Sequence, residues 1–214
     1  DEAERQEYRR DDGQAVHGPV DPVILPFLNL VIDENRLLAH LVQLFDKPQH
    51  ILPRIGDDGM VIDDGVTSRL GENHYVMTTT TGNAASVMSK LEDWIQTEWP
   101  ELKVYLTSVT EQFATISLNG PYALNLMKKL CPNQNFSKEN FPHMSFQNIE
   151  IDKVACRVMR ISFTGEMCYE INVPSSYAKA LWEKCFDLGQ KYKVTPYGTE
   201  AMHVLRAEKG FIIV

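Results

Sequence analysis

Residues 160–178 read RISFTGEMCYEINVPSSYA, and the pattern of this segment indicates the fold class. The alternation of apolar and polar side chains predicts one strand over 158–163 and a returning strand over 169–173, with a tight turn between them. Ser175 or Ser176 is expected to cap the helix that follows. A strand, a turn, a second strand and a helix in one short segment are typical of an α+β domain.

Two more strand-and-helix units precede this segment along the chain. In the first, a strand over 75–80 leads into a helix that Asn83 is expected to cap. In the second, a strand over 113–118 leads into a helix that ends at Leu130. Residues 131–148, rich in Asn, Pro and Phe, are interpreted as a long ordered loop. The pattern predicts an α+β fold of mixed or antiparallel sheets with packed helices.

The sequence before these units differs in composition. Residues 1–20 are polar and charged, and we interpret them as a mobile tail. Residues 21–55 combine an apolar run with a helix that Asp33 is expected to cap. Residues 56–214 hold the strand-and-helix units, and we expect sub-units at about 56–148 and 149–214.

Composition narrows the possible functions. The 214 residues are 43% hydrophobic and 23% charged, and a formal net charge of −8 argues against nucleic acid as a partner. No run approaches the roughly 20 apolar residues of a membrane span, so no membrane association is expected. The four cysteines form no CxxC pair and the six histidines are scattered, so we predict no metal site. The thiols are expected to be reduced, in a cytoplasmic protein.

Asp63 is the first candidate for a functional acid. It follows the apolar residues 60–62 and is itself followed by Asp64. Because neighbouring residues on a strand point to opposite faces, only one of the two aspartates can enter a pocket. There it could hydrogen-bond an amine or act as a base. A turn aspartate that binds its own backbone is the open alternative.

Glu170 is the second candidate. It stands between Tyr169 and Ile171 in the strand predicted over 169–173, so it would face away from both apolar neighbours. A carboxylate offers two acceptors in one plane, which suits a bidentate contact to a guanidine-like heterocycle. The alternative is a polar residue on the outer face of an edge strand.

From about residue 57 the chain resembles the glycine-cleavage T-protein (aminomethyltransferase) superfamily. Within it, the chain is similar to the C-terminal, folate-binding part of the alpha subunits of heterotetrameric sarcosine oxidases. The segments that carry the resemblance are DDGMVIDDGVTSRL (57–70), HYVMTTTTGNAA (74–85), LEDWIQTEWPELKVYLTSVTEQFATISLNGP (91–121), RISFTGEMCYEINVPSSYA (160–178) and PYGTEAMHVLRAEKGFIIV (196–214).

The resemblance implies a domain that binds tetrahydrofolate and accepts the methyl-derived one-carbon unit of sarcosine onto it, giving 5,10-methylenetetrahydrofolate. The first acid of the family's G-x-x-x-D-D pattern falls on Asp63, which implies a catalytic carboxylate near the reacting folate nitrogens. The second acid of T-G-E-x-x-x-E falls on Glu170, which implies cofactor binding at the amino-pyrimidine edge of the pterin. Flavin and NAD are expected only on other subunits or domains. The implied partners are a flavin-bearing beta subunit and the other sarcosine oxidase subunits.

The chain departs from the family pattern at three places. Residues 1–55 do not match the usual start, and family members continue beyond the point where this chain ends. Met202 stands where T-proteins usually carry arginine, so Arg206 is not assigned to folate. We therefore expect a fragment or reduced relative that forms part of an enzyme. Two alternatives stay open: a non-catalytic folate-binding or subunit-interface module, and a stand-alone aminomethyltransferase-like enzyme.

Overall fold

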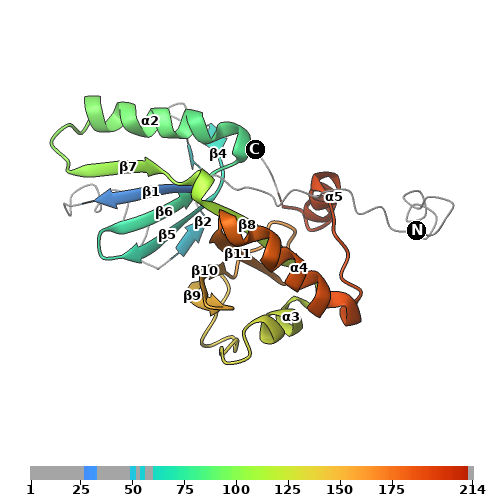
Figure 1. Ribbon diagram of the computed structural model, residues 1–214. Coiled ribbons are helices and arrows are strands. Elements are labelled where there is room, and N and C mark those ends of the chain that lie inside the picture. The colour runs from blue at the N-terminus through green and yellow to red at the C-terminus, as the bar shows by residue number, and fades with distance from the viewer. Residues whose placement is uncertain (1–26, 33–48, 52–53, 56–59, 212–214) are drawn as a thin grey trace.

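The computed structural model describes residues 27–32, 49–51, 54–55 and 60–211. Within these residues, two larger antiparallel sheets and a two-stranded ribbon are packed with helices (Figure 1). This is the α+β arrangement of antiparallel sheets and packed helices that the sequence predicts. The tail expected over 1–20 and the helix expected after Asp33 lie outside the described residues.

The first sheet has five strands in the order β2–β5–β6–β1–β7, and every neighbouring pair is antiparallel. Its strands are β1 (Phe27–Ile32), β2 (Gln49–Ile51), β5 (Val66–Gly71), β6 (His74–Thr78) and β7 (Val104–Ser108). A short ribbon of β3 (Arg54–Ile55) and β4 (Val61–Asp63) precedes β5 along the chain. After β6 the chain passes through the single turn η1 (Thr81–Asn83) into α2 (Ala84–Thr97), which contacts β7 (Figure 1).

The second sheet has four strands in the order β8–β11–β10–β9, again antiparallel throughout. Its strands are β8 (Phe113–Asn119), β9 (Phe146–Ile151), β10 (Val154–Met159) and β11 (Cys168–Pro174). Single helical turns, η2 (Thr110–Gln112) and η3 (Ser175–Tyr177), lie before β8 and after β11. The expected boundary between 148 and 149 falls within β9.

Two helices cover one face of the four-stranded sheet. They are α3 (Ala123–Leu130) and α4 (Ala178–Gly189), which contact each other and the strands beneath them (Figure 1). The helix-facing core combines apolar residues of all four strands with the buried stripes of both helices. Ala178, Leu181 and Cys185 supply the α4 stripe, as the helical spacing predicts.

The opposite face of the four-stranded sheet turns toward the five-stranded sheet. A smaller apolar cluster joins the two sheets there, formed by Val66, Val76, Val109, Met159 and Ile161. Because side chains alternate along a strand, residues beside Met159 in the pairing register share this face. We call it the inter-sheet face.

The strand predicted over 158–163 is wrong in its bounds. The structure has β10 over Val154–Met159, paired with a β9 whose first three residues fall in the loop predicted over 131–148 and whose other residues the sequence pattern did not assign. Asp152 and Lys153 join the two strands with positive φ angles of 51° and 67°, the backbone of a two-residue hairpin turn. Such turns are usually recognised by an Asn-Gly or Asp-Gly pair, and this hairpin has neither.

The predicted helix caps are also wrong in detail. Asn83 does occupy the position before α2, but its side chain makes no cap hydrogen bond and instead donates to the carbonyl oxygen of Ile62 at 2.5 Å. Ser175 lies in η3, one turn before α4, and its hydroxyl donates to the carbonyl oxygen of Glu111 at 2.7 Å. In both cases a partner far along the chain replaces the local bond that the sequence suggests.

The last helix, α5 (Thr199–Glu208), follows α4 through η4 (Gln190–Tyr192) and a short loop. No residue of α5 is buried. It is held near the β10–β11 connection by the ion pair between Lys209 and Glu166, at 2.6 Å. Gly165 makes this approach possible, because a Cβ there would lie 2.7 Å from Lys209 Cγ.

Candidate functional site

Glu170 lies in the middle of the four-stranded sheet. It belongs to β11, which pairs with β8 on one side and β10 on the other, so the edge-strand alternative is wrong. Its neighbours Tyr169 and Ile171 are in the helix-facing core, and Glu170 projects to the opposite, inter-sheet face. There it stands between Ser117 of β8 and Met159 of β10 in the pairing register.

The Glu170 side chain is buried, with 9% of its surface exposed. Burial raises the pKa of its carboxyl to about 7, because no cation among the described residues offsets the loss of water. A buried carboxyl of this kind is an acceptor that still needs donors. It can accept two N–H groups from a ligand, and near neutral pH it can also hold or release a proton.

The amide of Asn119, at the end of β8, organises the polar groups around Glu170. Its Oδ1 accepts a hydrogen bond from the hydroxyl of Thr164 at 3.0 Å. Its Nδ2 donates to Ser117 Oγ at 2.8 Å and to the phenol oxygen of Tyr197. Ser117 Oγ in turn lies 3.3 Å from Cys168 Sγ. Polar groups from two strands, a turn and the loop before α5 therefore meet on one face of the sheet.

Tyr197 is a site residue that the sequence analysis missed. Burial raises the pKa of its phenol to about 12, and the nearby Cys168 and Glu170 contribute to the rise. Its hydroxyl therefore stays protonated across the physiological pH range, so the oxygen accepts from Asn119 while the O–H can still donate. The PYG segment gave no signal for this role, because its partner Asn119 on β8 lies 78 residues earlier in the chain.

Asp63 is placed at the end of β4, facing the start of α2. It is buried, with 1% of its surface exposed, whereas Asp64 is only partly buried. Its Oδ1 accepts hydrogen bonds from Thr80 Oγ1 at 2.6 Å, from the Thr80 backbone N–H at 3.2 Å and from Asn83 Nδ2 at 3.5 Å. Its partners lie 17 and 20 residues further along the chain, so these bonds are not those of an aspartate that binds its own turn.

The three bonds to Asp63 have a structural consequence. They tie the β4 ribbon to the loop that opens α2, and they hold Oδ1 in one position. The two predicted acids lie on different sheets, since Asp63 belongs to the two-stranded ribbon and Glu170 to the four-stranded sheet. Each acid is buried, as expected of a residue with a task in the interior or at a site.

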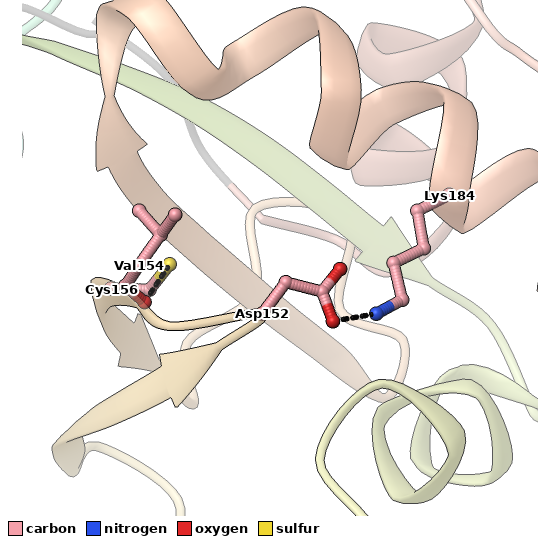
Figure 2. Close-up of polar contacts among 4 residues, drawn as sticks. All are labelled: Asp152, Val154, Cys156 and Lys184. Carbon is pink, nitrogen blue, oxygen red and sulfur yellow. Dashed lines mark hydrogen bonds and ion pairs between the residues drawn. The ribbon is translucent and has the colours of Figure 1, made fainter.

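The cysteines are built into the helix-facing core and the strands rather than into a reactive site. All four are free and buried. Burial raises the pKa of each thiol, to about 11 for Cys131 and Cys156 and to about 12 for Cys185. Figure 2 shows Cys156 Sγ directed at the carbonyl oxygen of Val154 and, as a separate contact, the ion pair between Asp152 and Lys184. These thiols are protonated and poorly nucleophilic.

Two other kinds of site are absent from the described residues. They hold no group of three or more His, Cys, Asp or Glu side chains arranged for a metal ion. None of their helices combines the length and apolar character of a membrane span. Arg206, which the sequence analysis left unassigned, donates to the carbonyl oxygen of Phe211 and so caps the end of α5.

The sequence matches the GCVT N-terminal domain family over residues 51–214. It is 54% identical over 158 residues to the sarcosine oxidase subunit alpha of Corynebacterium sp. (strain P-1). Those residues are 73% of this chain but only 16% of that subunit, so the chain spans about a sixth of its relative's length.

Solved structures match the fold at low sequence identity. One is the glycine cleavage system aminomethyltransferase T from Bartonella henselae, with a TM-score of 0.66 and 19% identity over 88% of this chain and 50% of that one. Another is the heterotetrameric sarcosine oxidase from Corynebacterium sp. U-96, with a TM-score of 0.58 and 12% identity over 83% of this chain and 86% of that one. Both support the aminomethyltransferase type of fold that the sequence resemblance implied.

Proposed function

Because the chain belongs to the GCVT N-terminal domain family, we propose that it is a folate-binding, one-carbon-transfer domain of a sarcosine oxidase alpha-type subunit. In this role it accepts the methyl-derived carbon of sarcosine onto tetrahydrofolate to give 5,10-methylenetetrahydrofolate. The identity of 54% to a sarcosine oxidase subunit alpha supports the oxidase type over other branches of the superfamily.

The observation that carries this proposal is the buried carboxyl of Glu170. It has no cation beside it among the described residues, and its pKa is raised to about 7 by burial. The amino-pyrimidine edge of a reduced pterin presents two adjacent N–H donors, which match the two oxygens of a carboxylate. The residues present therefore fit the ring of tetrahydrofolate, with Glu170 as its anchor and Tyr197 and Ser117 as polar neighbours.

Asp63 is proposed as the catalytic carboxylate. Its Oδ1 is held by three donors, so the charge is fixed in place before any ligand arrives. A fixed negative charge favours positive charge that develops on the one-carbon unit during transfer, and it needs no reorganisation at that moment. The proposed role is electrostatic and orienting rather than covalent.

The proposal also places the chain in a larger assembly. A flavin-bearing beta subunit is proposed to oxidise sarcosine, and flavin and NAD are proposed to bind only to other subunits or domains. One of the structural neighbours is a heterotetrameric sarcosine oxidase, which supports the idea of several subunits. We propose a cytoplasmic location for the complex.

A non-catalytic module is the second candidate function. The observation in its favour is that Asp63 Oδ1 is occupied by hydrogen bonds that join β4 to the start of α2, which is a sufficient reason for a buried aspartate. In that case the domain binds folate, or contacts another subunit, without performing transfer. A stand-alone aminomethyltransferase-like enzyme is the third reading, supported by the likeness to aminomethyltransferase T.

Isothermal calorimetry with tetrahydrofolate tests the proposal. We expect saturable binding by the full chain, at least tenfold weaker binding by Glu170→Gln, and unchanged binding by the control Glu183→Gln, which alters an exposed acid on α4. An absence of heat up to high micromolar ligand would reject folate binding.

Methylene transfer, measured with the complete oxidase, then separates the two candidate functions. Asp63→Asn is expected to reduce transfer far more than affinity. Equal losses of transfer and affinity would leave Asp63 with a holding role only, and would favour the non-catalytic module.

A further inference from the structure

A polar row crosses the inter-sheet face next to Glu170. In the pairing register, Thr115 of β8 stands beside Asn172 of β11, which stands beside Arg157 of β10 and then Asn148 of β9. Glu170 occupies the adjacent row, two residues from Asn172 on the same strand and the same face. The inter-sheet face therefore carries a buried carboxylate and, about 7 Å away along β11, a row of amides, a hydroxyl and a guanidinium.

Two donors in this row lack acceptors among the described residues. Asn172 has 1% of its surface exposed, and its Oδ1 accepts a hydrogen bond from Thr115 Oγ1 at 2.6 Å. Within the described part of the chain, its buried Nδ2 has no partner, and neither has the buried Nε of Arg157 on the facing strand. Burial lowers the pKa of the Arg157 guanidinium. Unpaired buried donors are costly, and two of them on facing strands suit a group with acceptor atoms placed between them.

Glu170 and Arg157 do not neutralise each other. They occupy diagonal positions in the register, because Glu170 faces Met159 and Arg157 faces Asn172. Burial alone accounts for the raised pKa of Glu170, so no ion pair links the two side chains. The inter-sheet face thus offers two acceptors at Glu170 and, beside them, donors at Asn172 and Arg157.

We propose that Asn172 and Arg157 form a subsite that donates hydrogen bonds to the 4-oxo oxygen of a 2-amino-4-oxo heterocycle. Glu170 accepts hydrogen bonds from the N–H edge of the same ring. This inference rests on the proposed function, since it takes Glu170 as the anchor of a reduced pterin. The 2-amino group and the ring N–H adjoin the 4-oxo oxygen on one edge of such a ring. The acceptors of Glu170 and the donors of Asn172 and Arg157 match that donor–donor–acceptor order.

The subsite makes the domain selective for 4-oxo over 4-amino rings. A ligand carbonyl supplies the acceptor that both side chains lack. A 4-amino ring instead sets a donor against these donors, and its N3 carries no hydrogen for Glu170, so we expect the native chain to bind it more weakly for both reasons. The contribution of the subsite is therefore read from how much each variant changes the affinity for each ligand. Removing the Asn172 amide therefore lowers the affinity for the 4-oxo ligand and leaves the affinity for the 4-amino ligand nearly unchanged. One such hydrogen bond corresponds to roughly three- to tenfold in affinity.

The test compares two ligands on three proteins by calorimetry: tetrahydrofolate and 4-amino-4-deoxytetrahydrofolate on the native chain, Asn172→Leu and Asn148→Leu. Leucine has the same branching at Cγ and the same number of side-chain heavy atoms as asparagine, and it removes the polar atoms. Asn148 is an exposed asparagine at the other end of the same row, so Asn148→Leu is the matched control. We expect Asn172→Leu to lose roughly three- to tenfold in affinity for tetrahydrofolate and less than about twofold for the 4-amino ligand. The control is expected to bind both ligands as the native chain does.

Urea unfolding without ligand separates a ligand-binding role from a merely structural one. Asn172→Leu removes the unpaired Nδ2 but also the acceptor of the buried Thr115 hydroxyl, so it is compared with the double variant Thr115→Val/Asn172→Leu, which removes both partners and is expected to unfold at an equal or higher urea concentration than the native chain. If Asn172→Leu does not fold, Arg157→Met takes its place with the same expected selectivity.

Each outcome of the titrations decides one question. If Asn172→Leu loses the same affinity for both ligands, or loses affinity for neither, the subsite is overturned. The proposed binding of the ligand to Glu170 would still stand. No binding of tetrahydrofolate by the native chain overturns the proposed function and this inference with it.

Discussion

Two buried acids, Asp63 and Glu170, differ in the groups that stabilise their negative charge. Asp63 has three hydrogen-bond donors on one oxygen, which holds the carboxylate as part of the framework. Glu170 is buried to a similar degree but has no cation among the described residues, and the pKa of its carboxyl rises to about 7. Local sequence does not distinguish these cases, because both acids adjoin strand-like apolar residues.

The pKa of Glu170 predicts a pH-dependent stability. Its ordinary pKa of 4.5 applies to the unfolded chain, and its pKa of about 7 to the folded protein. Between these values the folded protein binds the extra proton, so the free energy of unfolding falls as pH rises, and the loss levels off above about pH 7. We expect Glu170→Gln to be more stable than the native chain by up to about 3 kcal/mol at pH 8, and by far less at pH 5.

Urea unfolding at pH 5, 6, 7 and 8 measures this difference. The control Glu183→Gln changes an exposed acid and should follow the native chain at every pH. A difference between Glu170→Gln and the native chain that does not change with pH would contradict the buried, uncompensated state of Glu170.

The hydrogen bonds of Asp63 predict that two substitutions differ in their effect on the free energy of unfolding. Asp63→Ala removes the acceptor of three hydrogen bonds and should lower the free energy of unfolding by about 2 kcal/mol. Asp63→Asn retains an oxygen acceptor and should cost about half as much. The comparison is made by urea unfolding, with Glu92→Ala, an exposed acid on α2, as the control. Equal costs for Asp63→Ala and Asp63→Asn would mean that the charge rather than the acceptor matters.

At the scale of secondary-structure elements, the attachment of α5 depends on a glycine. Gly165 has a φ of 75°, and a Cβ there would lie 2.7 Å from Lys209 Cγ and 2.9 Å from Lys209 Cβ. Gly165→Ala therefore strains the turn and pushes away the residue that pairs with Glu166.

We expect Gly165→Ala to lower the free energy of unfolding by about 1–2 kcal/mol and to speed proteolysis in the loop before α5. Gly82→Ala is the matched control, since its Cβ would meet no atom within 4 Å. Unchanged proteolysis in Gly165→Ala would show that α5 is held by other contacts.

The packing of the helices on the four-stranded sheet predicts protected thiols. Cys131 ends α3, Cys185 lies in the α4 stripe, and Cys156 and Cys168 lie on strands, all buried. We expect the four thiols to react with Ellman's reagent only at the rate of unfolding and to react at once when urea unfolds the chain. Ser176→Cys, at an exposed position before α4, should add one fast thiol. Rapid labelling of the native chain would contradict the burial.

At the scale of the whole molecule, the two large sheets meet through a small cluster that includes Met159. Met159 is the register neighbour of Glu170, so the joint between the sheets and the candidate ligand anchor share one face. Packing changes at this joint should therefore reach the site, whereas changes in the helix-facing core should not.

Two large-to-small variants test this separation. Met159→Ala and Leu181→Ala each empty part of a buried cluster and should each cost about 2–5 kcal/mol of stability. Only Met159→Ala should also weaken tetrahydrofolate binding, measured by calorimetry at a temperature where both variants remain folded. Equal affinity losses would mean that the site responds to stability in general.

Sequence patterns predicted the α+β class and several elements of the described region, but not the strands β1, β2, β5 and β7 that flank β6 in the five-stranded sheet. Helical spacing located α2, α3 and α4, and period-two alternation located β6, β8 and β11, because each signal arises within one element. The β9–β10 hairpin was not predicted, because its turn at Asp152–Lys153 adopts a left-handed backbone without glycine or asparagine. The hydrogen bonds that Asn83 and Ser175 make in place of helix caps were not predicted, because their partners are 21 and 64 residues away.

Motifs and periodicity are local properties of the chain, so they were enough to indicate the family, the α+β class and the two acids worth testing. Only the tertiary structure decided that Glu170 is buried without a cation among the described residues, that Tyr197 and Asn119 lie beside it, and that Asn172 and Arg157 keep unpaired donors there. The physical reason is that desolvation and hydrogen-bond partners depend on which strands become neighbours. Neighbouring strands such as β8 and β11 are separated by loops and helices, so no local stretch of sequence specifies which side chains meet.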